Sequence, residues 1–184
     1  MKNCESNIDS LFEEFVSKRI PYAILLKTEE WKNHRNKIVA RDEECCTNCG
    51  LGATVKSMVK SKNGLSRYFN VFKVVDSQGK VGKKVSLVEK PRHLEVHHRY
   101  YVMAKNPWEY PDEALITLCN WCHQKIHDTT NIPCYSHEGE KLNYTPCHRC
   151  AGSGTFPEHN HVYAGVCFHC DGARYEELID QGEN

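Results

Sequence analysis

Cysteine spacing is the feature that most constrains how this chain can fold. Eight of the eleven cysteines fall into four C-x-x-C pairs, a spacing typical of structural zinc sites. The pairs are Cys46/Cys49, Cys119/Cys122, Cys147/Cys150 and Cys167/Cys170, whereas Cys4, Cys45 and Cys134 are left over. Two tetrahedral sites of four thiolates would use all eight paired residues. The sequence therefore predicts two structural zinc ions.

The N-terminal sequence bears on the cellular compartment. It opens MKNCESNIDSLFEEF, with acidic residues where a secretory signal would be basic, and the chain contains no apolar run long enough to cross a bilayer. We therefore expect a cytoplasmic protein with no membrane partner. In a reducing compartment, so many thiols are better explained by metal thiolates than by disulfides.

Positive charge is concentrated in one segment, although the formal net charge of the chain is zero. The stretch from Leu51 to Arg92 holds ten Lys/Arg residues against only Asp76 and Glu89. Such a surface is a candidate for binding a polyphosphate backbone. Taken alone, the same charge pattern also fits the solvated face of an ordinary surface hairpin.

Apolar periodicity predicts helices and a hairpin in the first half of the chain. Thr28 can cap a helix over TEEWKNHRNKIVARD, because Glu29 and Glu30 occupy its first turn. An earlier helix is predicted over Ser10 to Lys18, ended by Pro21. The segments YFNVFKVV and KKVSLVE, rich in β-branched and aromatic residues, predict a β-hairpin around the turn DSQGK.

The second half predicts the order strand, loop, strand, helix. HLEVHH and ALITLC are typical of short strands, the Pro-containing segment between them of a loop, and NWCHQKIHD of a helix. The polar stretch TTNIPCYSHEGEKLNYTP is predicted to be a linker. The Gly-rich tail beyond it has no long periodic element, so metal must supply what a hydrophobic core cannot.

The histidines suggest a second kind of metal site. His123 and His127 are four residues apart and share one face of the predicted helix. A third ligand can come from the pair His97 and His98, but adjacent residues on a strand point to opposite sides. One of the two can bind a cation while the other takes a proton from water. That division predicts phosphodiester hydrolysis.

These motifs carry a resemblance to a known family. LEVHH, a loop and ALITLCNWCHQKIH, with CTNCG upstream, resemble the HNH endonucleases, in which two C-x-x-C pairs bind a structural zinc behind a ββα-metal active site. The resemblance spans roughly Tyr22 to Asp128, apart from the insertion between Gly50 and Pro91. It implies an α+β fold with a ββα-metal nuclease core, a helical N-terminus and the hairpin as an insertion.

The resemblance also implies roles for individual residues. Cys46, Cys49, Cys119 and Cys122 would hold the first structural zinc. A catalytic divalent metal (Mg²⁺, Mn²⁺, Ni²⁺ or Zn²⁺) would be held by His97, His123 and His127, with His98 as general base. The asparagine of the family motif is replaced here by Ala114.

The implied activity is hydrolysis of DNA, mainly double-stranded, to 5′-phosphate and 3′-hydroxyl ends. The expected contacts to the DNA backbone are Lys73, Lys80, Lys83, Lys84, Lys90 and Arg92. With one active site per chain, we expect nicking unless the protein forms a homodimer.

The C-terminal cysteines carry a second resemblance. CHRCAGSG and CFHCDGAR resemble half of the cysteine-rich zinc domain of DnaJ-type chaperones, which implies one zinc ion held by Cys147, Cys150, Cys167 and Cys170. Glycines after each pair allow positive φ, which lets backbone amides turn toward sulfur. The expected role is a zinc-ribbon-like stabilising or docking module, and a protein partner for it is left open.

The sequence thus predicts a nuclease domain over residues 1–132, with its core at 46–127 and a basic insertion at 51–92, followed by a zinc module over 133–184. Two alternatives remain open. One is a non-catalytic zinc-containing nucleic-acid-binding protein, in which His123 and His127 only cover the helix surface. The other is an adaptor built around the C-terminal zinc module.

Overall fold

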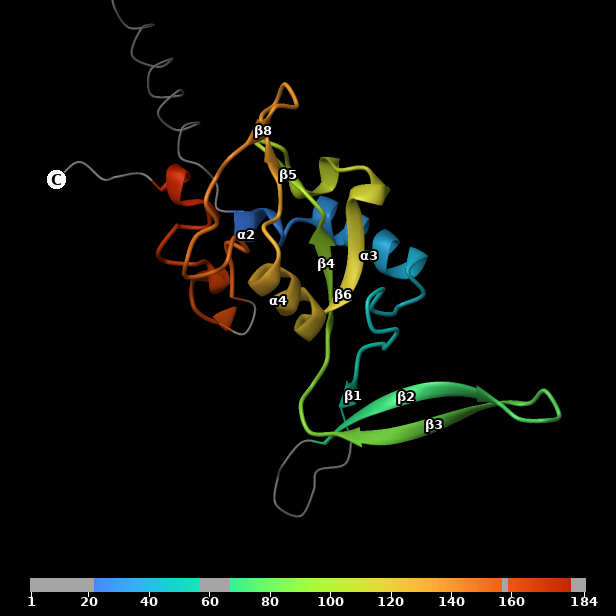
Figure 1. Cartoon of the computed structure of the whole chain (residues 1–184). Coiled ribbons are helices and arrows are strands. Elements are labelled where there is room, and N and C mark those ends of the chain that lie inside the picture. The colour runs from blue at the N-terminus through green and yellow to red at the C-terminus, as the bar shows by residue number, and fades with distance from the viewer. Residues whose placement is uncertain (1–21, 57–66, 157–158, 180–184) are drawn as a thin grey trace, which may run out of the picture.

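The computed structural model describes residues 22–56, 67–156 and 159–179. Within these ranges the chain has a mixed α/β fold of short helices and three small sheets (Figure 1). The helix predicted over Ser10 to Lys18 and the unpaired Cys4 lie outside the described residues. None of the described helices has the length and apolar character needed to cross a membrane.

The first long helix, α3 (Glu29–Arg41), follows the short α2 (Tyr22–Leu25). The Thr28 side chain accepts a hydrogen bond from the Trp31 amide at 3.3 Å, which satisfies one of the free donors at the helix start. Trp31 and Ile38 form the buried face of the helix. The helix predicted from its Thr28 cap is therefore confirmed.

A two-stranded antiparallel sheet and one helix form the centre of the molecule. Strand β4 (Leu94–His98) pairs with β6 (Leu115–Cys119), and α4 (Asn120–Thr129) continues directly from β6. Both α3 and α4 contact both strands (Figure 1). The predicted order of strand, loop, strand and helix is present, and it places the start of β4 and the end of β6 beside the start of α4.

The loop from β4 to β6 contains β5 (Tyr101–Val102) and two single helical turns, η1 (Pro107–Glu109) and η2 (Asp112–Ala114). The Tyr110 hydroxyl accepts a hydrogen bond from the Val102 amide at 2.8 Å. At the end of the loop, Ala114 is buried and its carbonyl accepts from the Arg99 amide at 2.9 Å. Backbone groups and a tyrosine thus hold this loop, in which the related motif has an asparagine.

The basic insertion forms a hairpin that projects from the body of the molecule (Figure 1). It consists of β2 (Tyr68–Val75) and β3 (Val81–Val88), and β1 (Val55–Lys56) pairs with the start of β2. The predicted hairpin is confirmed, although its second strand begins at Val81, two residues before the predicted KKVSLVE. Its side chains are mostly exposed, because no other helix or strand of the described residues covers either face.

The predicted linker after α4 is wrong, because this segment adds to a sheet. Strand β7 (Cys134–Tyr135) pairs in parallel with β5 and antiparallel with β8 (Lys141–Leu142). The apolar residues of this polar stretch bury against the body in one core made by Tyr22, Tyr101, Ile132, Cys134 and Tyr175. Segments on both sides of the predicted boundary at residue 132 therefore share this core.

The C-terminal segment is built around its cysteines, as expected for a chain with few apolar residues. Its helical pieces are single turns, η4 (Tyr163–Gly165) and η5 (Glu176–Leu178). The four cysteines form its buried cluster, against which Phe156, Ala173 and Ile179 pack. A cluster this small has little apolar surface, so a bound metal would contribute most of its stability.

Candidate metal centres

The first cysteine cluster joins a turn after α3 to the junction of β6 and α4. The sulfur atoms of Cys46, Cys49, Cys119 and Cys122 lie within 4.8 Å of one another, and those of Cys49 and Cys119 are 3.9 Å apart. A tetrahedral zinc site with bonds of about 2.3 Å has sulfur–sulfur edges of about 3.8 Å. The side-chain amide of Asn48 (Nδ2) also donates to the Cys122 sulfur at 3.2 Å.

The second cluster has the same dimensions. The sulfur atoms of Cys147 and Cys167 are 4.0 Å apart and those of Cys150 and Cys170 are 3.8 Å apart. The Gly154 amide donates to the Cys150 sulfur at 3.2 Å, as the glycine spacing predicted. Every described cysteine is free of a disulfide. The two tetrads are therefore zinc-binding modules, suited to two structural ions.

Backbone turns with positive φ bring the second tetrad together. Gly152 and Gly172 have φ of 78° and 77°, but the residues before them also lie in the left-handed region, Ala151 at 48° and Asp171 at 42°. A side chain disfavours this conformation by roughly 1–2 kcal/mol. Both turns are therefore held in place by the contacts around the sulfur atoms.

Three histidines form a third cluster. His97 on β4 meets His123 and His127 on α4, and their candidate ligand atoms lie within 4.8 Å of one another. The Nε2 atoms of His123 and His127 are 3.2 Å apart. Two nitrogen ligands about 2.0–2.1 Å from a tetrahedral zinc are separated by about 3.3–3.4 Å. The histidines that the sequence nominated for a divalent metal are thus brought together at a distance that suits one.

Hydrogen bonds at the far side of two rings fix their tautomers. The Glu95 carboxylate accepts from Nδ1 of His123 at 2.5 Å, and the Ala151 carbonyl accepts from Nδ1 of His127 at 3.2 Å. Both protons are then on Nδ1, so the two Nε2 lone pairs face each other. Facing lone pairs repel unless a cation or a proton lies between them. This arrangement is that of histidine ligands supported by outer hydrogen-bond partners.

The third ring, that of His97, has a nitrogen without a hydrogen-bond partner. His97 is buried, at 3% exposed, and its Nδ1 has no hydrogen-bond partner. A buried polar atom without a partner is costly, and a bound cation would satisfy it. The donor set of imidazoles fits Zn²⁺ or Ni²⁺ well.

Burial keeps the rings of His97 and His127 in the neutral form that binds metal. Desolvation lowers the pKa of His97 to about 2 and that of His127 to about 4. Burial raises the pKa of Glu95, but hydrogen bonds from His123 and His93 outweigh it and lower this pKa to about 2. Glu95 is therefore a carboxylate at neutral pH, and the imidazole lone pairs of His97 and His127 are available.

His98 lies on the opposite face of β4, away from the three-histidine cluster. Its ring is 3% exposed and stacks on Trp31 with centroids 5.3 Å apart. Its Nε2 is 3.2 Å from the Pro107 carbonyl and 3.1 Å from the Tyr22 hydroxyl. Since a carbonyl only accepts, Nε2 carries the proton and Nδ1 has the lone pair. Burial lowers the pKa of His98 to about 3, so the ring is neutral.

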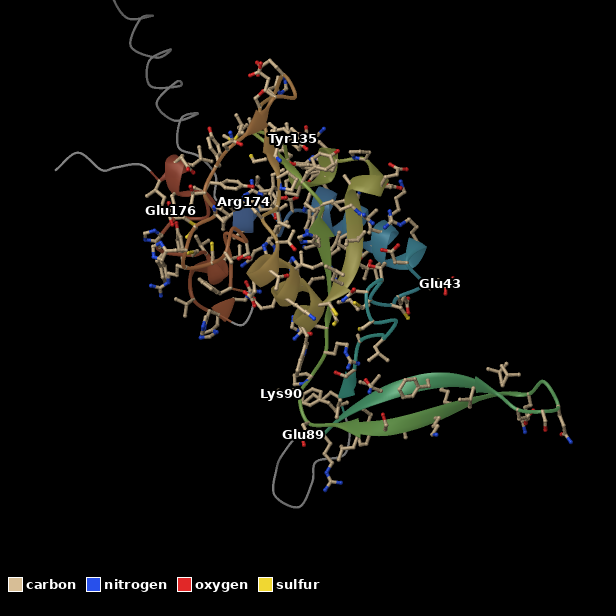
Figure 2. The ribbon with its side chains drawn as sticks, in the orientation of Figure 1. Glu43, Glu89, Lys90, Tyr135, Arg174 and Glu176 are labelled. Carbon is tan, nitrogen blue, oxygen red and sulfur yellow. The ribbon has the colours of Figure 1, made fainter. Side chains whose placement is uncertain are left out.

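The basic residues nominated for DNA follow the hairpin and its base. Lys83 and Lys84 are on β3, and Lys73 on β2 is the register partner of Lys83. Lys80 is in the turn. Lys90 lies at the base of the hairpin (Figure 2), and its Nζ is 5.7 Å from the centroid of the exposed Trp121 ring. Arg92 donates to the Asn70 side chain at 2.6 Å. An open cleft between α3 and β2 contains none of the three clustered histidines.

Sequence reasoning missed the two groups that orient the ligands. Glu95 lies two residues before His97 on the same strand, so period-two alternation could have placed it on the same face. No local signal could have identified the Ala151 carbonyl, because it comes from a distant turn of the second cysteine tetrad.

Comparison of the chain with known protein families, with curated proteins and with solved structures finds no match. The likeness to HNH nucleases and to the DnaJ zinc domain therefore stays a prediction from the motifs. Within the described residues, the geometry identifies two zinc-binding tetrads, one cluster of three histidines, and a fourth group of Cys147, His169 and Glu176 that shares Cys147 with the second tetrad.

Proposed function

We propose that the protein is a metal-dependent endonuclease that hydrolyses phosphodiester bonds of DNA. The observation that carries the proposal is the convergence of His97, His123 and His127. The Nε2 atoms of His123 and His127 are 3.2 Å apart, and their Nδ1 protons are donated to the Glu95 carboxylate and the Ala151 carbonyl. Each cysteine tetrad already supplies four thiolates for its structural zinc, so the three histidines are not needed to bind a structural zinc ion. Three imidazoles without a fourth protein ligand are typical of sites that leave a position open for substrate or water.

In this proposal each residue has a definite task. His97, His123 and His127 would hold a divalent cation, which supplies Lewis-acid stabilisation of charge on the phosphate and leaving oxygen. Glu95 keeps His123 in the ligand tautomer. His98 is the proposed acceptor of the proton from the attacking water. Its Nδ1 carries the lone pair and the Pro107 carbonyl holds its other nitrogen. The water would have to reach Nδ1 beside the Tyr22 hydroxyl, 3.4 Å away, on the face of β4 opposite the cation ligands.

The hairpin supplies the proposed nucleic-acid contacts. It extends away from the body (Figure 1), and its lysines lie across a ribbon narrow enough to follow a groove of duplex DNA. The contacts would be mainly to phosphates and so largely independent of sequence. We therefore expect nicking of double-stranded DNA with little sequence preference.

A plasmid-nicking assay tests this proposal. Supercoiled DNA is incubated with the zinc-loaded protein and Mg²⁺, Mn²⁺ or Ni²⁺, with and without EDTA. Nicking should require the added cation and should fall by at least about 100-fold in His98→Ala and in His127→Ala. The control is His161→Ala, because this histidine is exposed and belongs to none of the clusters.

The outcomes separate the parts of the proposal. If His98→Ala nicks DNA at the wild-type rate and His127→Ala does not nick it, His98 is not the base, but the cation site stands. No nicking by the wild type with any of the cations would refute the nuclease activity.

A second candidate is a non-catalytic nucleic-acid-binding zinc protein. The observation that favours it is the burial of His98 among Trp31, Tyr101 and Tyr110, where the ring acts as part of the core. Gel retardation of DNA without nicking by the wild type would support this candidate. Absence of both retardation and nicking would leave the adaptor function.

A further inference from the structure

Two segments far apart in the sequence meet at His127. The ring lies near the end of α4, is 6% exposed, and directs Nδ1 at the carbonyl of Ala151 in the second cysteine tetrad. This contact decides which nitrogen carries the proton, since the carbonyl can only accept. Nε2 of His127 is thereby left as the ligand atom, facing Nε2 of His123.

The position of this carbonyl depends on the cysteine turn. Ala151 directly follows Cys150 and has a φ of 48°, which a residue with a side chain adopts only under constraint. The constraint comes from bonds around Cys150: its carbonyl accepts from the Ser153 amide at 3.0 Å, and its sulfur accepts from the Gly154 amide at 3.2 Å. Without a metal in the tetrad, four thiols would have to hold this turn by themselves.

A buried arginine docks the same module against the body. Arg174 (labelled in Figure 2) is buried, and its guanidinium carbon lies 4.1 Å from the ring centroid of Tyr22 and 3.9 Å from that of Tyr101. The neighbouring Tyr175 hydroxyl donates to the Ile132 carbonyl at 3.3 Å. Cation–π contacts in a desolvated place are among the stronger ones, so these contacts hold the module against α2 and β5.

From these contacts we infer that the C-terminal zinc module positions His127 for cation binding. Zinc at the tetrad of Cys147, Cys150, Cys167 and Cys170 holds the Ala151 carbonyl, and the carbonyl holds His127 in the ligand tautomer. Occupancy of the tetrad therefore raises the affinity of the three-histidine cluster for a divalent cation. This inference rests on the cation site of the proposed function, but not on nuclease activity.

The size of the coupling follows from the loss of one outer hydrogen bond to a ligand. For His127 we therefore expect metal binding to weaken by roughly 10- to 100-fold. Linkage between two binding sites is reciprocal. A cation at the histidines should therefore strengthen zinc binding at the C-terminal tetrad by the same factor.

The experiment measures Ni²⁺ binding to the full-length, zinc-loaded protein by calorimetry. The double variant Cys167→Ser/Cys170→Ser removes two of the four thiolates of the tetrad and leaves Cys150 and Ala151 unreplaced. We expect its Ni²⁺ affinity to fall by roughly 10- to 100-fold. Nitrogen chemical shifts of the His127 ring, recorded without Ni²⁺, should change from the Nδ1–H tautomer to a mixture of tautomers. A general loss of packing elsewhere would not by itself change the tautomer.

Cys45→Ser is the matched control. It removes a thiol that belongs to neither tetrad, and its Ni²⁺ affinity should stay within about twofold of the wild type.

A measurement on the wild type avoids any folding defect of the variant. Zinc affinity of the C-terminal tetrad is measured by chelator competition with and without saturating Ni²⁺, and should rise with Ni²⁺. Ni²⁺ binding that is lost in His127→Ala but is independent of tetrad zinc would overturn this inference and leave the proposed cation site intact. Absence of Ni²⁺ binding by the wild-type histidines would overturn both.

Discussion

Replacement of Glu95 gives the sharpest test of the histidine cluster. Its carboxylate accepts from Nδ1 of His123 at 2.5 Å, and its side chain is only 18% exposed, so solvent offers little substitute for the contact. Outer partners of this kind contribute about 10- to 100-fold to metal affinity, or about 1.4–2.7 kcal/mol. We therefore expect Glu95→Ala to weaken Ni²⁺ binding by about that factor.

Glu95→Gln refines the test. The glutamine carbonyl can still accept from His123, but a hydrogen bond to an ionised partner is roughly twice as strong as a neutral one. About half of the free energy should then remain, which corresponds to a loss of about three- to tenfold in Ni²⁺ affinity. The order of affinity should be wild type, then Glu95→Gln, then Glu95→Ala.

The assay is calorimetric titration of Ni²⁺ into zinc-loaded protein, with zinc content measured beside it. Glu140→Gln is the matched control, because this carboxylate is exposed and lies outside the metal clusters. Both variants at position 95 should retain two zinc ions per chain, since the tetrads do not use Glu95. Ni²⁺ affinity in Glu95→Ala within about twofold of the wild type would refute the role given to this carboxylate.

Three further outcomes are expected. Ile38→Ala should lower the free energy of unfolding by about 2–5 kcal/mol in urea at fixed zinc, because Ile38 is fully buried against Trp31 and Leu115, and a loss under about 1 kcal/mol would contradict this packing. Lys83→Glu/Lys84→Glu should weaken DNA binding and reduce the slope of log affinity against log salt by about two, with an unchanged slope speaking against phosphate contacts at the hairpin. Burial raises the pKa of Asp42, but hydrogen bonds from Arg41 and Thr117 lower it overall, so the carboxylate stabilises the fold above the unfolded pKa and this contribution is lost as pH falls through the folded pKa. Asp42→Asn should therefore flatten the acid side of the curve of unfolding free energy against pH, and a curve identical to that of the wild type would exclude the effect.

Local elements could be predicted from the sequence because their signals are local. The Thr28 cap, the β-branched strands of the hairpin and the alternation in LEVHH each report on a few neighbouring residues. The linker prediction was wrong for a complementary reason. Ile132, Cys134 and Leu142 are too few to form a pattern of their own. Cys134 and Leu142 join a sheet by pairing with β5 and with each other, and all three residues pack in the core with Tyr22 and Tyr101.

For the candidate metal centres, the sequence by itself identified the candidate ligands. C-x-x-C spacing fixes two thiolates on one turn, and the interval of four residues puts His123 and His127 on one helix face. Both are short-range consequences of backbone geometry. The sequence also determined that His97 and His98 would face opposite ways, because side chains alternate along a strand.

Only the tertiary structure decided what surrounds those ligands. It placed His98 in an aromatic core, Glu95 behind His123, and the Ala151 carbonyl behind His127. The contacts Tyr22–His98, Glu95–His123 and His127–Ala151 join residues 76, 28 and 24 positions apart, so no local pattern encodes them. Hydrogen-bond direction and burial depend on what packs from elsewhere in the chain. These two properties set the tautomers of His123 and His127 and the neutral state of His97, His98 and His127.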